Sequence, residues 1–224
     1  MFLEVDFPNG KQLPAELKAQ NAKLAKDFAI QAYPTLMLCD AKGRPYAEAG
    51  FPEEMNPESM SKLLEEQKKF KATRDDAFAK AEKAEGAEKA KLLIEALGTV
   101  PEATVPSLYG ETIDQIAKLD PEDKTGFVKK AKTQQAMGEL ESGFGKLMEA
   151  DKTDEAVKYI DDFLAKHKPE GEPKQKAMML KMFGFASAEK FEDAIKVADE
   201  IIKIDGGSET GNMVKQIKKQ LEQQ

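Results

Sequence analysis

Residues 30–50 read IQAYPTLMLCDAKGRPYAEAG, and this stretch predicts one short β-hairpin in a chain otherwise rich in lysine and glutamate. Residues 35–39 form a continuous apolar run, which is typical of a buried strand. Asp40 to Gly43 has the composition of a tight turn, and residues 44–48 supply the returning strand. The predicted hairpin therefore has Tyr33-Pro34-Thr35 at its entrance.

The flanking residues predict the neighbouring elements. Residues 1–7 alternate apolar and acidic side chains, which indicates a strand closed by a turn. Apolar side chains at helical spacing predict a helix over residues 17–28. After the hairpin, Asn56 and Pro57 supply an N-cap and a first-turn proline for a helix that runs to about residue 70. The expected order is strand, helix, strand, strand, helix.

Residues 21–51, NAKLAKDFAIQAYPTLMLCDAKGRPYAEAGF, resemble the second half of a thioredoxin fold. In that family a helix ends in an apolar residue, and a proline followed by threonine comes four positions later. A hairpin with an Asp-x-x-Gly turn follows. The residues that match this arrangement are Ile30, Pro34, Thr35, Asp40 and Gly43.

The resemblance implies a binding role for the hairpin entrance. Pro34 takes the place of the family's cis-proline, and the backbone of Tyr33 faces the active site and pairs with an extended thiol substrate. Tyr33, Pro34 and Thr35 are therefore the expected substrate-binding residues. A plainer alternative stays open, in which Tyr33-Pro34 only starts the strand and fills space beneath a helix.

The redox Cys-x-x-Cys of thioredoxins lies upstream of the matching region and has no counterpart here. The resemblance thus implies a truncated thioredoxin-like protein, whose parent function is thiol-disulfide exchange or disulfide handling and whose given chain is redox-inactive. The chain has one cysteine, Cys39, and one histidine, His167. We expect no catalytic residue, metal site or cofactor, because one thiol and one imidazole build neither a dithiol nor a multi-ligand zinc site.

The resemblance also implies unpaired sheet edges. In the family another strand lies between the strands that residues 1–7 and 35–39 would form. Exposed edges recruit a further strand or must be covered. We therefore expect the small sheet to rearrange, to self-associate through its edges, or to be covered by helices from the second part of the chain.

Residues 71–224 are predicted to be helical throughout, with a periodic end. Asp154–Lys158 is matched by Glu192–Lys196, 38 positions later, and the unit between them is two helices joined through residues 168–173. This resembles a tetratricopeptide-like helical-hairpin array, although the usual period is about 34 residues. The Met- and Phe-rich helix at residues 178–185 either lines a peptide groove on such an array or packs in its core.

We therefore expect an α+β protein with two parts. Residues 1–70 form a partial thioredoxin-like β-α-β-β-α module, and residues 71–224 form an all-α, TPR-like helical-hairpin domain. The expected partner is a protein or peptide. The alternative is a noncatalytic interaction or scaffold protein that uses its helical repeat surface.

Charge and hydropathy limit the remaining possibilities. The formal net charge is -7 and lysines alternate with acidic residues, so a nucleic-acid partner, which needs clustered Lys and Arg, is not expected. No apolar stretch approaches the roughly 20 residues that span a bilayer. The compartment follows the parent protein: periplasmic or exported for an envelope thioredoxin-like protein, and cytoplasmic otherwise.

Overall fold

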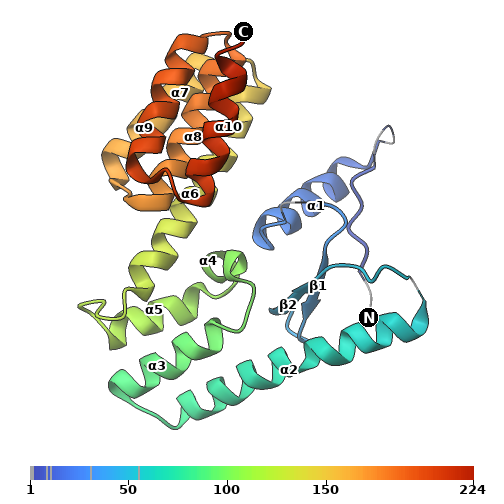
Figure 1. The fold of residues 1–224 in the computed structure, drawn as a ribbon. Coiled ribbons are helices and arrows are strands. Elements are labelled where there is room, and N and C mark those ends of the chain that lie inside the picture. The colour runs from blue at the N-terminus through green and yellow to red at the C-terminus, as the bar shows by residue number, and fades with distance from the viewer. Residues whose placement is uncertain (1–2, 9, 11, 31, 55) are drawn as a thin grey trace. The chain divides into compact units, whose positions relative to one another are not determined.

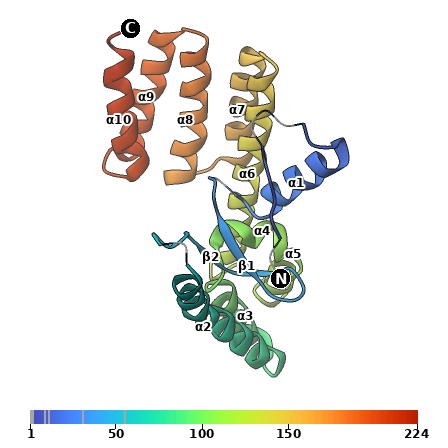
Figure 2. The same ribbon diagram turned by 90° about the vertical axis from the view of Figure 1, so that its right-hand side faces the viewer.

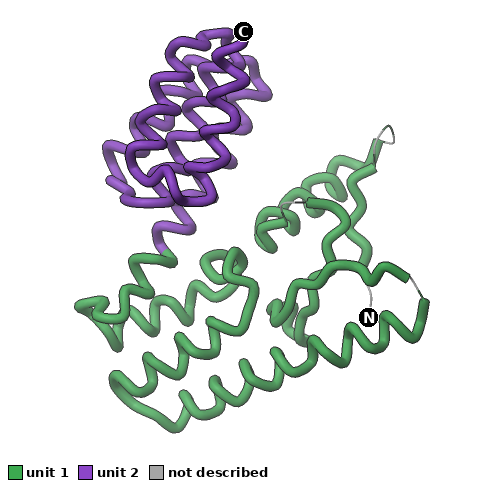
Figure 3. The backbone as a smooth tube through the Cα atoms, in the orientation of Figure 1, with its two compact units in different colours: residues 1–131 green, residues 132–224 purple. Residues whose placement is uncertain are grey.

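The computed structural model describes residues 3–8, 10, 12–30, 32–54 and 56–224. Over these residues the protein is mostly helical, with a two-stranded antiparallel sheet, which agrees with the expected α+β class at this coarse level (Figure 1). The chain divides into two compact units, residues 1–131 and 132–224 (Figure 3). The domain boundary predicted from the sequence, between residues 70 and 71, lies within one continuous helix of the first unit, residues 57–82.

The first unit contains a helix, a hairpin and a group of further helices. Its elements are α1 (Ala15–Asp27), β1 (Leu36–Cys39), β2 (Pro45–Ala49), α2 (Pro57–Glu82), α3 (Gly86–Leu97), the 3-10 helix η1 (Glu102–Thr104), α4 (Val105–Leu108) and α5 (Gly110–Leu119). As predicted, Pro57 opens α2 and the Asn56 side chain accepts a hydrogen bond from the Ser59 N–H at 2.8 Å. Helix α2 continues well beyond the predicted end near residue 70.

Residues 3–7 do not form a strand, which corrects the strand predicted over residues 1–7; residues 1–2 lie outside the described residues. A strand needs a neighbour to complete its backbone hydrogen bonds, and the sheet holds β1 and β2 alone among the described residues. The segment is instead tied to α1, because the buried Asn21 side chain donates to the Asp6 carbonyl oxygen at 2.8 Å.

The hairpin is held at its turn and on one face. Asp40 Oδ1 accepts hydrogen bonds from the backbone N–H groups of Lys42 at 2.9 Å and Arg44 at 3.0 Å. Gly43 has φ +76°, a left-handed conformation that glycine adopts without steric cost. Buried hairpin side chains pack against α2, which covers the sheet, in an apolar cluster of Leu36, Leu38, Tyr46, Ala47, Ala49, Leu63 and Leu64.

A fully buried arginine joins the hairpin to the helices. The Arg74 guanidinium on α2 donates to Asp40 Oδ2 at 2.9 Å, to Asp75 Oδ1 at 2.8 Å and to Tyr109 Oη at 3.1 Å. Tyr109 Oη in turn donates to the Pro45 carbonyl oxygen at 2.7 Å. Burying a charge is costly unless it is paired and hydrogen-bonded, and these contacts meet that requirement.

The Asp40 carboxylate stays ionised over a wide pH range. Burial raises its pKa, but hydrogen bonds from the backbone N–H groups of Arg44 and Lys42 and from the Arg44 side chain outweigh burial and lower the pKa to about 2. The carboxylate is therefore charged at neutral pH and able to pair with the buried guanidinium.

The helices of the first unit share one apolar core. Helix α3 packs against α2 and α5, and the start of α6 (Phe127–Glu149) closes the group. The buried side chains of this core are Ala81, Leu93, Leu97, Val100, Val105, Tyr109, Ile113, Ile116, Val128 and Ala131. Because Tyr109 belongs to this core and also bonds Pro45, the same side chain anchors the hairpin to the helices.

The second unit is an array of helices that run side by side (Figures 1 and 2). Besides the later part of α6, its elements are α7 (Thr153–His167), α8 (Gly171–Ser187), α9 (Phe191–Asp205) and α10 (Glu209–Leu221). The 38-residue offset relates buried positions: Ala156 corresponds to Ala194, and Ile160 to Ala198. Met178 and Met182 are buried, so most of the Met-rich helix packs in the core.

The repeat begins one helix earlier than the sequence suggested. Asp151 and Glu189, 38 positions apart, both have φ 58° and form the tight turns before α7 and α9. The same offset relates the buried Leu140 of α6 to the buried Met178 of α8. The 38-residue offset therefore relates α6 to α8 as well as α7 to α9. It also fits the unit of two helices joined through residues 168–173, since α8 begins at Gly171 and α10 begins 38 positions later at Glu209.

Glycine allows close approach in the second unit. A Cβ atom on Gly143 would lie 2.5 Å from the Tyr159 ring, whereas Gly138 and Gly145 face open space. Gly211 is more constrained, because a Cβ atom there would lie 2.1 Å from the Asp205 carbonyl oxygen. The Gly211 N–H donates to the Ser208 side chain at 2.9 Å, which caps α10 and fixes this close contact.

Replacing Arg74 tests the buried network. We expect Arg74→Met to lower the free energy of unfolding by about 3 kcal/mol or more, because it leaves the buried Asp40 carboxylate and the Tyr109 hydroxyl without a shared partner. The matched variant Arg44→Met removes an exposed partner of the same carboxylate and should cost at most about 1 kcal/mol. Urea unfolding followed by circular dichroism measures both, and equal losses would contradict a dominant role for Arg74.

Replacing Gly211 tests the close contact at the start of α10. Gly211→Ala should lower the stability of the protein by about 1–3 kcal/mol, because the added methyl group meets backbone that has no room to move. Gly138→Ala, in an open helix position, should be neutral or stabilising by up to about 1 kcal/mol. Thermal unfolding compares the two, and a neutral Gly211→Ala would rule the contact out.

Candidate functional site

One feature of the hairpin entrance agrees with the resemblance. The Tyr33–Pro34 peptide bond is cis, as expected. The Thr35 hydroxyl donates to the Ala32 carbonyl oxygen at 2.6 Å and so holds the turn before β1. The Tyr33 ring is 61% exposed and packs on Phe7, with ring centroids 5.1 Å apart.

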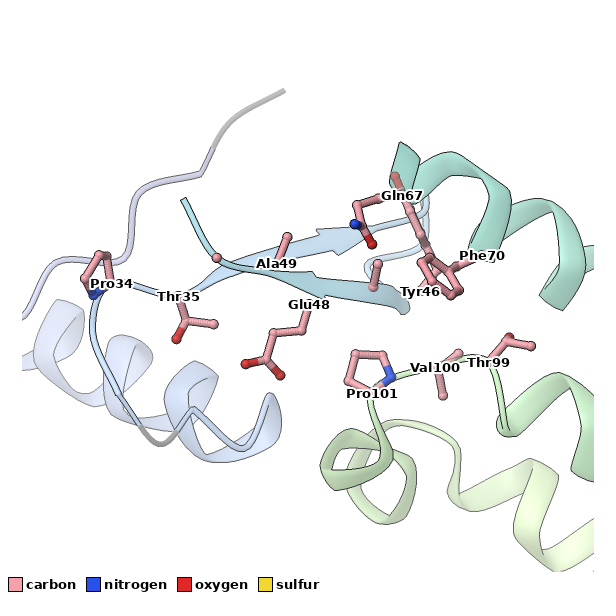
Figure 4. Close-up of a pocket in the computed structure, with 12 residues that line it drawn as sticks. Pro34, Thr35, Tyr46, Glu48, Ala49, Gln67, Phe70, Thr99, Val100 and Pro101 are labelled. Atoms are coloured by element: carbon pink, nitrogen blue, oxygen red, sulfur yellow. The ribbon is translucent and has the colours of Figure 1, made fainter. Parts of the chain in front are cut away.

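A groove of about 650 Å³ opens beside this entrance (Figure 4). Two of the three residues predicted to bind substrate, Pro34 and Thr35, line it, whereas Tyr33 does not. The other walls come from β2, from α2 and from the segment that precedes η1. They are formed by Tyr46, Ala47, Glu48, Ala49, Gly50, Gln67, Phe70, Thr99, Val100 and Pro101.

The strand β2 presents its edge to the groove. Successive side chains of a strand point to opposite faces of the sheet, yet five consecutive residues, 46–50, line the space. The groove therefore runs along the outer edge of β2, opposite its pairing with β1. At the start of the strand this edge is closed, because the Pro45 carbonyl oxygen accepts hydrogen bonds from Tyr109 and Arg74.

The groove has an apolar wall and one charged side chain. Phe70 is 38% exposed and lies near Tyr46 at one end, and Pro101 and Val100 form the floor in Figure 4. Of the described residues that line the groove, Glu48 is the only charged one, and in Figure 4 its carboxylate points away from β2 into the space between Thr35 and Pro101. No ion pair or hydrogen bond to the Glu48 side chain occurs within the described part of the chain.

Cys39 is poorly suited to thiol chemistry. It is the last residue of β1 and is half-buried, in keeping with the strand-end position expected from the sequence. Burial, and then the neighbouring Asp40 carboxylate, raise the pKa of the Cys39 thiol above its ordinary value of 9.0. A reactive thiol needs the opposite shift, since the thiolate is the nucleophile.

The remaining candidate residue, His167, is not among the residues that line the groove. His167 ends α7 and stacks on Phe163 with ring centroids 4.6 Å apart. Within the residues that the structure describes, no group of three or more His, Cys, Asp or Glu side chains is placed to hold a metal ion. Among the helices described, none combines the length and apolar content needed to cross a lipid bilayer.

The sequence did not indicate most of the groove. Glu48 alternates with alanines in a plain strand pattern, and Phe70 and Gln67 lie on a helix rich in polar residues. Val100 and Pro101 lie more than 45 residues beyond β2, and no local pattern relates them to the hairpin. The signal that could be used was the Tyr33-Pro34-Thr35 entrance, which leads to one end of the groove.

The chain matches no protein-family model, no curated protein sequence and no solved structure. Its function is therefore inferred from the groove itself. The groove offers a strand edge, an apolar wall and one carboxylate to a ligand.

The reactivity of Cys39 tests whether its thiol takes part in redox chemistry. Because the pKa of its thiol is raised, we expect Cys39 to react with Ellman's reagent at pH 7–8 several times more slowly than glutathione. In an insulin reduction assay with dithiothreitol, the protein and its Cys39→Ser variant should both match the rate of dithiothreitol alone. A rate above that background, lost in Cys39→Ser, would show a redox-active thiol.

Proposed function

We propose that these 224 residues act by binding an extended protein or peptide segment in the groove beside the hairpin entrance. The observation that carries this proposal is that Pro34 and Thr35 line the same groove of about 650 Å³ as the outer edge of β2. Ligand sites are commonly concave, largely apolar and supplied with a few well-placed polar groups. The groove is concave and combines an apolar wall with the Glu48 carboxylate and the edge of β2.

The proposed lineage is thioredoxin-like, and the proposed parent function is thiol-disulfide exchange or disulfide handling. The order α1, β1, β2, α2 supports it, because the second half of that fold has a helix, a hairpin and a helix in this order. The 224 residues contain one cysteine and so provide no dithiol for disulfide exchange within the chain. Binding, without redox chemistry, is the activity proposed for this part.

A second candidate is a binding role for the helical repeat surface. A smaller groove of about 360 Å³ lies between α7, α8 and α9 in the second unit. It is lined by lysines and acidic residues around Leu164, Met178 and Ile204. If a protein or peptide binds at this surface, Lys203→Glu should lower its affinity, whereas a substitution in the hairpin groove should leave that affinity unchanged.

Filling the hairpin groove tests the proposed function. Peptides selected from a phage-displayed library of random sequences, about 12 residues long, serve as the probe. Thr35→Arg places a bulky side chain in the groove and should weaken binding by about tenfold or more. The control Thr73→Arg makes the same change at an exposed position of α2 and should alter the affinity by less than about twofold.

Isothermal titration calorimetry measures these affinities. Circular dichroism checks that both variants keep the fold. The proposal is wrong if the library yields no binder, or if Thr35→Arg binds the selected peptides as tightly as Thr73→Arg does.

A further inference from the structure

The open edge of β2 offers unpaired backbone groups to the groove. In an antiparallel pair, alternate peptide groups of each strand point away from the partner strand. The Pro45 carbonyl oxygen is occupied by Tyr109 and Arg74. Beyond it, residues 47–50 make no hydrogen bond outside the β1 ladder in the part of the chain that the structure describes. An extended chain is the ligand whose own backbone complements such an edge.

The shape of the groove suits a strand. A strand of five residues is about 17 Å long, and residues 46–50 border the groove along this length. Phe70 lies beside the edge at one end and Pro34 at the other, and Pro101 faces it across the space (Figure 4). A helix, about 10 Å or more in diameter, would not bring its backbone donors to this edge.

The negative charge of Glu48 favours particular side chains on a peptide strand that enters the groove. Glu48 is exposed, points into the groove and has no partner among the described residues. Among the residues that the structure describes, no lysine or arginine lines the groove to neutralise it. A lysine or arginine on an incoming strand would complement this carboxylate, whereas an aspartate or glutamate opposite it would be repelled.

We propose that the ligand of this groove is an extended peptide that adds as a strand to the outer edge of β2 and places a lysine or arginine beside Glu48. This inference rests on the proposed function and specifies the class of ligand and the mode of binding. Specificity comes from Glu48 and the apolar wall at Phe70, and affinity comes from the backbone hydrogen bonds along residues 47–50.

The charge preference is tested with the same phage-displayed library of random peptides. Against the unmodified protein we expect selected sequences enriched in lysine or arginine, β-branched and aromatic residues, and poor in proline. Glu48→Lys should weaken binding of these peptides by about tenfold or more and should select acidic peptides instead. The control Glu53→Lys makes the same charge change at an exposed residue outside the groove and should leave the selection unchanged.

The backbone pairing is tested on the tightest selected peptide. N-methylation of alternate residues removes the donors on one edge of a strand. Of the two alternate sets, one should weaken binding by about tenfold or more and the other much less. Equal effects of the two sets, or selected peptides without basic residues, would overturn this inference.

The outcomes separate the two proposals. If Thr35→Arg lowers the affinity of the selected peptides but Glu48→Lys and backbone methylation do not, the groove is a binding site, and its ligand is not a basic peptide added as a strand. A failure to select any peptide would reject both. If light scattering shows a dimer whose dissociation exposes residues 46–50 to hydrogen exchange, the edge is occupied by a second copy, and the basic peptide is rejected as its ligand.

Discussion

The first unit depends on the satisfaction of one buried charge. Arg74 lies on α2 with its guanidinium fully buried, and its partners come from the hairpin turn, from its own helix and from the residue before α5. Each partner constrains the position of an element, because a buried guanidinium whose hydrogen bonds are unmade is costly. The hairpin has few core residues of its own, so this polar contact fixes its orientation on α2.

The groove is a consequence of that orientation. Tyr109 and Arg74 hold the beginning of β2 through the Pro45 carbonyl oxygen, while the rest of the strand pairs, among the described residues, with β1 alone. The strand is thus supported at one end and open along its outer side. The segment before η1 faces this open side, and the space between them becomes the groove.

Local sequence signals predicted the elements well where a few neighbouring residues determine them. The Asn56-Pro57 cap, the Asp40 turn and the two helices with a 38-residue offset all depend on short-range chemistry. The strand expected over residues 1–7 is absent from the described residues 3–7, since alternation alone does not supply a neighbour to pair with.

Local sequence patterns did not predict the contacts between residues far apart in the chain. Arg74 resembles the many other charged residues of α2, and nothing in its neighbourhood marks it as buried. Its pairing with Asp40 and Tyr109, each more than 30 residues away, appears only when the helices pack. Only a small part of the candidate site was predictable for the same reason: Pro34 and Thr35 belong to a local motif, whereas Phe70, Val100 and Pro101 come to the groove from distant segments.

Proline at the first position of β2 also determines the alignment of any chain that pairs there. Pro45 has no backbone N–H, and its carbonyl oxygen is already bonded, so the ladder cannot extend past this residue. A pairing chain must begin its hydrogen bonds at a defined place, and a shift by one residue would turn every side chain to the opposite face. Pro45 therefore acts as a register stop, which decides which side chain of a partner strand meets Glu48.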